Sequence, residues 1–351
     1  MSTRTMKAWV YRTRGQASEV LNLESDYPRP TPSGDQVLIK VRAVAINPLG
    51  WKMMGVPPFS WMGKIPSVPE FDVSGTIVEG GLTGTDLKEG EAVFGVQTAE
   101  AVMKTGQGVL AEYALVPKQH LRRLPKNLDF EKAAVAPVAV LTAIKILETG
   151  GITNGGAAAG KRVFINGGSS AVGINAVLIA SAYGAQVSTT CSSSSRSFVE
   201  SLASDIRTFD YRASPLPQQL ADFVKEDKKP FDVIFDCVGV PALYHNSPSY
   251  LSSDGQYIDI AGRDLDGKIV SVLKAAFYLF RNLLQPTWLG GTPRNYKFVP
   301  MSPSLILKSS SLGTLEPVVD NVFDFEDAKK AYERSMSGRA RGRIVIRVAQ
   351  D

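Results

Sequence analysis

The sequence predicts an α/β protein of two domains, a β-rich barrel domain and a doubly wound parallel sheet. A chain of 351 residues is long enough for two domains. Short strands and turns fill its first part, whereas strands alternate with helices from about residue 129 onward. A glycine-rich turn also joins one of the later strands to a helix. Composition is that of an ordinary globular protein, with 44% hydrophobic and 21% charged residues.

The first part of the chain is typical of an antiparallel β domain. Turn signals such as Pro30–Asp35 and Leu87–Glu91 separate its apolar segments. The expected strands are Met6–Tyr11, Gln36–Ala45, Val73–Glu79, Ala92–Val96 and Ala111–Val116. Their number and spacing predict a domain built around a small barrel.

The remaining chain predicts a parallel sheet covered by helices. Helices are expected at Phe130–Val135, Leu141–Leu147 and Ala328–Met336, and strands at Val163–Asn166, Gln186–Thr190, Val233–Asp236 and Gln256–Ala261. A closing strand at Arg343–Val348 is expected to rejoin the barrel. The predicted domains are therefore residues 1–128 with 303–351, and residues 129–302.

The segment Lys268–Pro300 interrupts this alternation. Its helix, Val272–Leu284, carries Phe277 and Phe280, and a further strand is expected at Lys297–Val299. An aromatic stripe on a helix packs more often than it binds a ligand, so a packing insert or a contact between protomers is favoured over a substrate lid. The chain is expected to be a monomer or a homodimer.

The glycine-rich turn predicts a dinucleotide site. Gly168–Gly173 keeps the first and third glycines of G-x-G-x-x-G and has Ser170 at the second. Alone, such a turn could simply pack a helix against a strand, but the order of strand, turn, helix and second strand favours cofactor binding. The expected cofactor-binding residues here are Gly168, Ser169, Ser170, Ala171 and Val172 at the pyrophosphate, and Cys237, Val238 and Gly239 after the strand that ends at Asp236.

The tip of the next strand decides between the two nicotinamide cofactors. Gln186–Cys191 is followed by Ser192–Arg196, with no Asp or Glu to meet a free ribose 2′-hydroxyl. Hydroxyl groups and an arginine suit a 2′-phosphate instead. We therefore expect NADPH, with its 2′-phosphate surrounded by Ser192, Ser193, Arg196 and Tyr211; the alternative is that this stretch is only a polar loop.

Composition makes several other functions unexpected. The net charge is +5, but no long Lys/Arg cluster marks a nucleic-acid site. Zinc sites need three or four ligands, and the chain has two cysteines and two histidines, so no metal is expected. No apolar run approaches a membrane span, and Met1–Val10 lacks a signal core. Two cysteines and no glycosylation sequon suit a cytoplasmic protein.

The order of barrel, nucleotide sheet and return to the barrel resembles the medium-chain dehydrogenase/reductase superfamily. Within it, the chain is similar to the zinc-free quinone-oxidoreductase and trans-acting enoyl-reductase branch. The matching motifs are Ala45–Lys52, Pro69–Gly75, Ala111–Tyr113, Leu141–Ala143, Asp210–Tyr211, Phe235–Gly239 and Gly338–Val345. Zinc-containing relatives carry Gly-His-Glu where this chain has Glu70-Phe71-Asp72, and branch members commonly carry Asp where it has Gly50.

This resemblance implies a GroES-like barrel, a Rossmann domain and an NADPH-dependent oxidoreductase. The implied reaction is hydride transfer, without zinc, to an enoyl or enone double bond or to a quinone, as in fungal secondary-metabolite biosynthesis. The resemblance assigns the catalytic roles to Asn47, Lys52 and Thr142. Each also has a simpler interpretation. Asn47 could form a turn before Pro48, Lys52 could be a surface charge, and Thr142 could cap or pack a helix. A protein that binds NADPH as a sensor, partner or non-redox catalyst stays open as the alternative.

Overall fold

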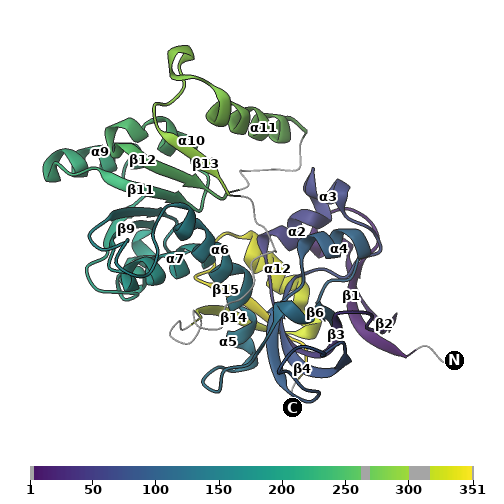
Figure 1. Ribbon diagram of the computed structural model, residues 1–351. Helices are drawn as coiled ribbons and strands as arrows, with labels where there is room; N and C mark the ends of the chain where they lie inside the picture. The colour runs from purple at the N-terminus through teal and green to yellow at the C-terminus, as the bar shows by residue number, and fades with distance from the viewer. Residues whose placement is uncertain (1–3, 262–268, 300–316, 350–351) are drawn as a thin grey trace. The chain divides into compact units, whose positions relative to one another are not determined.

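The computed structural model describes residues 4–261, 269–299 and 317–349 (Figure 1). The described residues form two compact units. The first unit contains the residues up to Leu141 and those from 317 onward, and the second contains the residues from Thr142 to 299. The expected second boundary, at residues 302/303, lies outside the described residues.

The first boundary falls within a helix. Helix α6 (Ala136–Thr149) begins in the first unit and continues into the second. The preceding helix, α5 (Phe130–Ala134), belongs to the first unit, because Ala134 packs in one apolar cluster with Ala43 and Val345. The alternation of strands and helices thus begins before the chain leaves the first unit.

The first unit is built on a seven-stranded sheet, which contains the expected strands near Gln36–Ala45, Val73–Glu79 and Ala92–Val96 and also two strands that were not predicted, Leu121–Arg123 and Val319–Asp324. The strand order is β14-β15-β3-β4-β5-β7, and β6 pairs with β3. Val345 pairs antiparallel with Ala45, which confirms that the closing strand rejoins this sheet. A separate ribbon is formed by β1 and β2. These strands are β1 (Thr5–Tyr11), β2 (Leu21–Pro28), β3 (Gln36–Ala45), β4 (Asp72–Gly80), β5 (Ala92–Val96), β6 (Tyr113–Pro117), β7 (Leu121–Arg123), β14 (Val319–Asp324) and β15 (Arg343–Arg347).

Short helices complete the first unit. They are α1 (Ala17–Val20), α2 (Pro48–Gly55), α3 (Phe59–Met62), α4 (Ala99–Thr105) and α12 (Ala328–Met336). Helix α2 begins where Asn47 leaves the extended conformation, and Pro48 stands at its first position. Proline is favoured there because its fixed φ suits the first helical turn and its missing N–H would have no partner.

The second unit is a six-stranded sheet in which all strands run parallel. Its order, β10-β9-β8-β11-β12-β13, corresponds to 3-2-1-4-5-6. The order reverses between β8 and β11, and open α/β sheets bind dinucleotides at such a point. The strands are β8 (Arg162–Asn166), β9 (Gln186–Cys191), β10 (Arg207–Asp210), β11 (Phe231–Asp236), β12 (Leu251–Asp259) and β13 (Asn295–Phe298).

The helices of the second unit follow the predicted alternation. Besides α6, they are α7 (Ala171–Ala182), α8 (Arg196–Glu200), α9 (Leu216–Asp227), α10 (Pro241–His245) and α11 (Ile269–Leu284). Helix α11 packs beside β13 (Figure 1). However, Phe277 and Phe280 are 66% and 62% exposed, so these rings do not pack in the core of this chain.

Candidate functional site

Steric crowding explains both glycines that the turn between β8 and α7 retains. A Cβ on Gly168 would lie 2.2 Å from the Thr189 Oγ1 atom, and one on Gly173 would lie 2.0 Å from the Gly167 carbonyl oxygen. Gly167 itself has a φ of 95°, a conformation that favours glycine. The turn can therefore approach both β9 and the first turn of α7 only with glycine at these positions.

Ser170 departs from the glycine motif for a local reason. Its φ of −76° and ψ of 159° are open to any residue, so glycine is not required. Ser170 is the N-cap of α7, and its hydroxyl accepts the N–H of Gly173 at 3.1 Å. Serine satisfies one donor of the first helical turn, which a glycine could not do.

The start of α7 fits the pyrophosphate of a dinucleotide. Ala171 and Val172 occupy its first two positions, and the N–H groups of a first turn have no partner within the helix. They point in the direction from which an anion approaches, and the helix dipole favours negative charge there. Thr190 holds the turn in place, because its Oγ1 accepts the Gly167 N–H at 2.7 Å and its carbonyl accepts the Gly168 N–H at 2.9 Å.

A buried polar chain links the ends of three neighbouring strands of the second unit. The Thr190 hydroxyl donates to Asn166 Oδ1 at 2.8 Å, and Asn166 Nδ2 donates to Asp236 Oδ1 at 2.8 Å. The N–H groups of Val238 and Gly239 also donate to Asp236 Oδ1, at 3.0 and 2.8 Å. These two amides are therefore already engaged in hydrogen bonds within the turn.

Cys237 lies at the start of the same turn. Its N–H donates to the Asn166 carbonyl at 3.1 Å. Burial, together with the nearby Asp236 carboxylate, raises the pKa of the Cys237 thiol. Cys237 is therefore a neutral packing group at physiological pH and not a nucleophile.

The second unit brings the predicted 2′-phosphate residues to neighbouring strand ends. Ser192, Ser193 and Arg196 follow β9, and Tyr211 follows β10, whose last residue, Asp210, pairs with Cys191. Tyr211 is 50% exposed, and the Arg196 side chain is 51% exposed, where an incoming anion can reach it.

Sequence reasoning missed two residues at this strand end, because they come from β10 and the turn after it. Asp210 Oδ2 accepts the N–H of Ser193 at 3.0 Å, and Oδ1 accepts the N–H of Arg212 at 2.9 Å. The carboxylate thus organises the serine turn. Arg212 lies with its guanidinium 5.4 Å from the Tyr211 ring centroid and adds a cation to this strand end. A basic residue directly after Asp210-Tyr211 is the signal that could have found it.

The three predicted catalytic residues lie in different surroundings. Thr142 belongs to the second unit, on α6, and is 8% exposed. Lys52 lies on α2 of the first unit and is partly buried, with Nζ 5.6 Å from the Trp51 ring centroid. Asn47, just before α2, is only 1% exposed.

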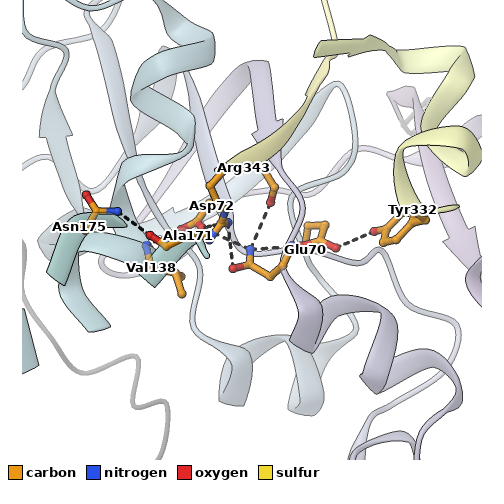
Figure 2. A network of polar contacts seen from close by, with 9 residues as sticks. Glu70, Asp72, Val138, Ala171, Asn175, Tyr332 and Arg343 are labelled. Carbon is orange, nitrogen blue, oxygen red and sulfur yellow. Dashed lines mark hydrogen bonds and ion pairs between the residues drawn. The ribbon is translucent and has the colours of Figure 1, made fainter. Parts of the chain in front are cut away.

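Asn47 takes part in a buried polar network with Glu70, Asp72 and Arg343, three of the residues labelled in Figure 2. Its N–H donates to Glu70 Oε2 at 2.9 Å, and its Oδ1 accepts Arg343 at 3.0 Å. Its Nδ2 lies 3.3 Å from both Glu70 Oε2 and Asp72 Oδ2. The network continues from Glu70 Oε1 to the Tyr332 hydroxyl at 2.8 Å, and from Asp72 Oδ2 to Arg343 at 2.6 Å.

Burial sets the protonation of this network. It raises the pKa of Glu70 to about 7, against the lowering effect of hydrogen bonds from Tyr332 and Asn47. It also raises the pKa of Asp72 to about 6, against the lowering effect of the Arg343 charge. Arg343 balances one carboxylate, and a protonated Glu70 leaves no uncompensated charge in the interior. Sequence analysis had noted Glu70 and Asp72 only as residues at the place of a zinc motif.

Within the described ranges, no cluster of three or more His, Cys, Asp or Glu side chains could hold a metal ion. Phe71, at the place of the histidine in the zinc motif, is a buried core residue. The described helices are also too short or too polar to cross a membrane.

Comparisons with known proteins agree with both units. Residues 33–126 match the family model of the alcohol dehydrogenase GroES-like domain, and residues 215–346 match that of the zinc-binding dehydrogenases. The chain is 30% identical to the trans-enoyl reductase poxH of Penicillium oxalicum, covering 100% of both chains. It is 32% identical to the trans-enoyl reductase pgmF of Aspergillus terreus, covering 98% of this chain and 96% of the relative.

Two further comparisons extend these similarities. The chloroplastic NADPH-dependent alkenal/one oxidoreductase of Arabidopsis thaliana is 31% identical, over 97% of this chain and 79% of its own length. The solved quinone oxidoreductase of Coxiella burnetii has the same fold, with a TM-score of 0.78 and 23% identity over 99% of this chain and 100% of its own.

Proposed function

The chain belongs to the medium-chain dehydrogenase/reductase superfamily, in its enoyl-reductase and quinone-oxidoreductase-like branch, and we propose from that premise that it is an NADPH-dependent reductase of activated carbon–carbon double bonds. The observation that carries this proposal is the cofactor half-site of the second unit. It combines a glycine turn that ends in free first-turn amides with serine, arginine and tyrosine residues at the neighbouring strand ends. Relatives named as trans-enoyl reductases and as an alkenal/one oxidoreductase support the class of substrate.

The preference for NADPH is supported by the chemistry around Ser193. Asp210, the acid nearest to the serine turn, accepts backbone N–H groups from Ser193 and Arg212. Each of its oxygens thereby already accepts one backbone N–H, whereas Arg196, in an exposed ion pair 4.0 Å from Glu200, and Arg212, near the Tyr211 ring, supply two cations. Such a surface favours a dianionic phosphate over a ribose hydroxyl.

NADPH, when bound, supplies the hydride that reduces the β-carbon of the substrate. The protein must then stabilise the negative charge that develops on the conjugated carbonyl oxygen. With no zinc required in this proposal, hydrogen-bond donors and positive charge take that role. Thr142 can donate its hydroxyl, and Lys52 can supply charge or a proton. Quinones are accepted on the same terms, since they too form an oxyanion.

Asn47 is assigned a positioning role in this proposal. Its amide hydrogens and its Oδ1 atom are engaged by Glu70, Asp72 and Arg343. A substrate would therefore have to compete with a buried network for the side chain. Asn47 instead fixes the point at which α2 begins, five residues before Lys52.

The test is turnover by the purified chain with NADPH and a panel of enones, enals, enoyl thioesters and quinones. We expect NADPH consumption with at least one conjugated substrate, and a product in which the double bond is reduced and the carbonyl is retained. Tight NADPH binding with no consumption across the panel would favour the non-redox alternative. Reduction of the carbonyl instead of the double bond would contradict the proposed substrate class.

A further inference from the structure

Gly50 has no room for a side chain. A Cβ at this position would lie 2.1 Å from Glu70 Oε1, 2.7 Å from Cδ and 2.9 Å from Oε2. Gly50 is buried within helix α2 and does not adopt a positive φ, so its backbone conformation does not require glycine. Glycine also weakens a helix relative to alanine. What requires glycine at residue 50 is the Glu70 carboxylate, which fills the space of its side chain.

Glu70, in contrast to Gly50, has a backbone conformation that favours glycine although it carries a long side chain. Its φ is 73°, in the left-handed region that favours glycine, and its side chain is fully buried. Branch members commonly have an acid at residue 50, and zinc-containing relatives have glycine at residue 70. This chain instead has Gly50 and Glu70, and the two positions meet in space. The carboxylate of Glu70 thus fills the space that a side chain at residue 50 would need, although the two segments are distant in sequence.

The carboxylate connects two helices from this place. Oε2 accepts the N–H of Asn47, the N-cap residue of α2, at 2.9 Å, and Oε1 accepts the Tyr332 hydroxyl of α12 at 2.8 Å. No side chain caps α2 otherwise. Glu70 thereby fixes the start of the short helix that carries Lys52.

We propose that Glu70 is a positioning residue of the active site, which takes the place of the acid at residue 50 and holds α2 so that Lys52 meets the substrate. The part concerning Lys52 rests on the reductase function proposed above. The shared space of residues 50 and 70 rests on the geometry, whereas the comparison with an acid at residue 50 rests on the resemblance to the branch.

An exchange experiment tests the first part. The variants are Gly50→Asp, Glu70→Gly and the double variant, compared in thermal unfolding. Gly50→Asp should be strongly destabilised because two carboxylates compete for one space, and Glu70→Gly should leave the Asn47 N–H and the Tyr332 hydroxyl without their acceptor. We expect the double variant to melt above both single variants. A double variant that melts at or below the less stable single variant would overturn the exchange.

A second pair of variants tests the positioning of Lys52. Glu70→Gln keeps an acceptor oxygen for the Asn47 N–H and places an NH2 group that can donate to the Tyr332 hydroxyl oxygen, whereas Glu70→Met has a similar size and no hydrogen-bonding group. Glu70→Met should lower kcat by about tenfold or more while the NADPH Kd stays unchanged, and Glu70→Gln should retain most of the activity. In a Lys52→Met background, Glu70→Met should lower kcat little further, because its effect passes through Lys52.

The outcomes separate the two proposals. If Glu70→Met lowers kcat by the same factor in the wild-type and in the Lys52→Met background, then Glu70 has only a structural role and its positioning role is overturned. If the wild-type protein fails to consume NADPH with every substrate of the panel, the reductase function is refuted, and the proposed effect of Glu70 on Lys52 is refuted with it. The thermal unfolding of the exchange variants would still decide whether Glu70 occupies the place of residue 50.

Discussion

Replacing Glu70 by glutamine should change how the stability of the first unit depends on pH. Glutamine has nearly the same shape as a protonated glutamate and cannot ionise. Burial raises the pKa of Glu70 from its ordinary value of 4.5 to about 7. In the wild type, the folded chain therefore keeps a proton on Glu70 over a pH range in which the unfolded chain has released it.

The sign and size of the effect follow from this difference. The stability contributed by protonated Glu70 is fully present below a pH of about 4.5 and is lost as the pH rises to about 7. A difference of roughly two and a half pKa units, at about 1.4 kcal/mol each, amounts to about 3–4 kcal/mol in the free energy of unfolding. The Glu70→Gln variant lacks this loss, so it should gain that amount relative to wild type between about pH 5 and pH 8.

Urea unfolding at several pH values measures this gain directly. Trp9, Trp51 and Trp61 lie in the same unit as Glu70 and Trp288 lies in the other, so tryptophan fluorescence in a Trp288→Phe background reports the unfolding of the first unit. Glu333→Gln, which removes an exposed acid next to Tyr332 on α12, controls for the loss of one negative charge. If wild type and Glu70→Gln show the same pH dependence throughout this range, then Glu70 is ionised in the folded chain and the assigned protonation is wrong.

Three further predictions concern the cofactor and the reaction. Removing the Arg196 side chain should weaken NADPH binding by about tenfold to a hundredfold and leave NADH binding unchanged; titration with both cofactors checks this, and equal losses would remove Arg196 from the phosphate site. The purified protein should contain no stoichiometric zinc, and chelators should leave its turnover unchanged; elemental analysis and activity before and after chelation test this. Replacing Thr142 by valine keeps the shape without the hydroxyl, so kcat should fall by about tenfold or more while NADPH affinity is retained; an unchanged kcat on the best enone would assign Thr142 to packing.

The fold was largely predictable because its central strands are buried on both sides. Val163, Phe164 and Ile165 of β8 are fully buried, and such short apolar runs read clearly as strands of a parallel sheet. Edge strands lack this signal. The β10 strand contains Arg207 and Asp210, and β2 alternates only weakly, since one face of each borders solvent. Neither strand was predicted.

The residues proposed to bind the cofactor could be picked out from the sequence because most of them lie close together in it. One turn between β8 and α7 supplies several of them, and a glycine pattern records its steric needs. The network around Asn47 could not be predicted in this way. Tyr332 and Glu70 are 262 residues apart, and Arg343 and Asn47 are 296 apart. No local pattern links such residues, so only the fold brings them together.

The pair formed by Gly50 and Glu70 makes a last prediction about the relatives of this chain. Considered separately, Gly50 lacks the acid that branch members commonly carry at this position, and Glu70 is an acid in an unfavourable backbone conformation. In the structure, the two residues explain one another, because the Glu70 carboxylate occupies the space that a side chain at residue 50 would need. A change at either position alone should be disfavoured: an acid at both would put two side chains in one space, and glycine at both would leave the Asn47 N–H and the Tyr332 hydroxyl without an acceptor. Relatives with glycine at residue 50 should therefore carry Glu or Gln at residue 70, and relatives with Asp at residue 50 should carry glycine there. An alignment in which the two positions vary independently would show that the shared space does not constrain them.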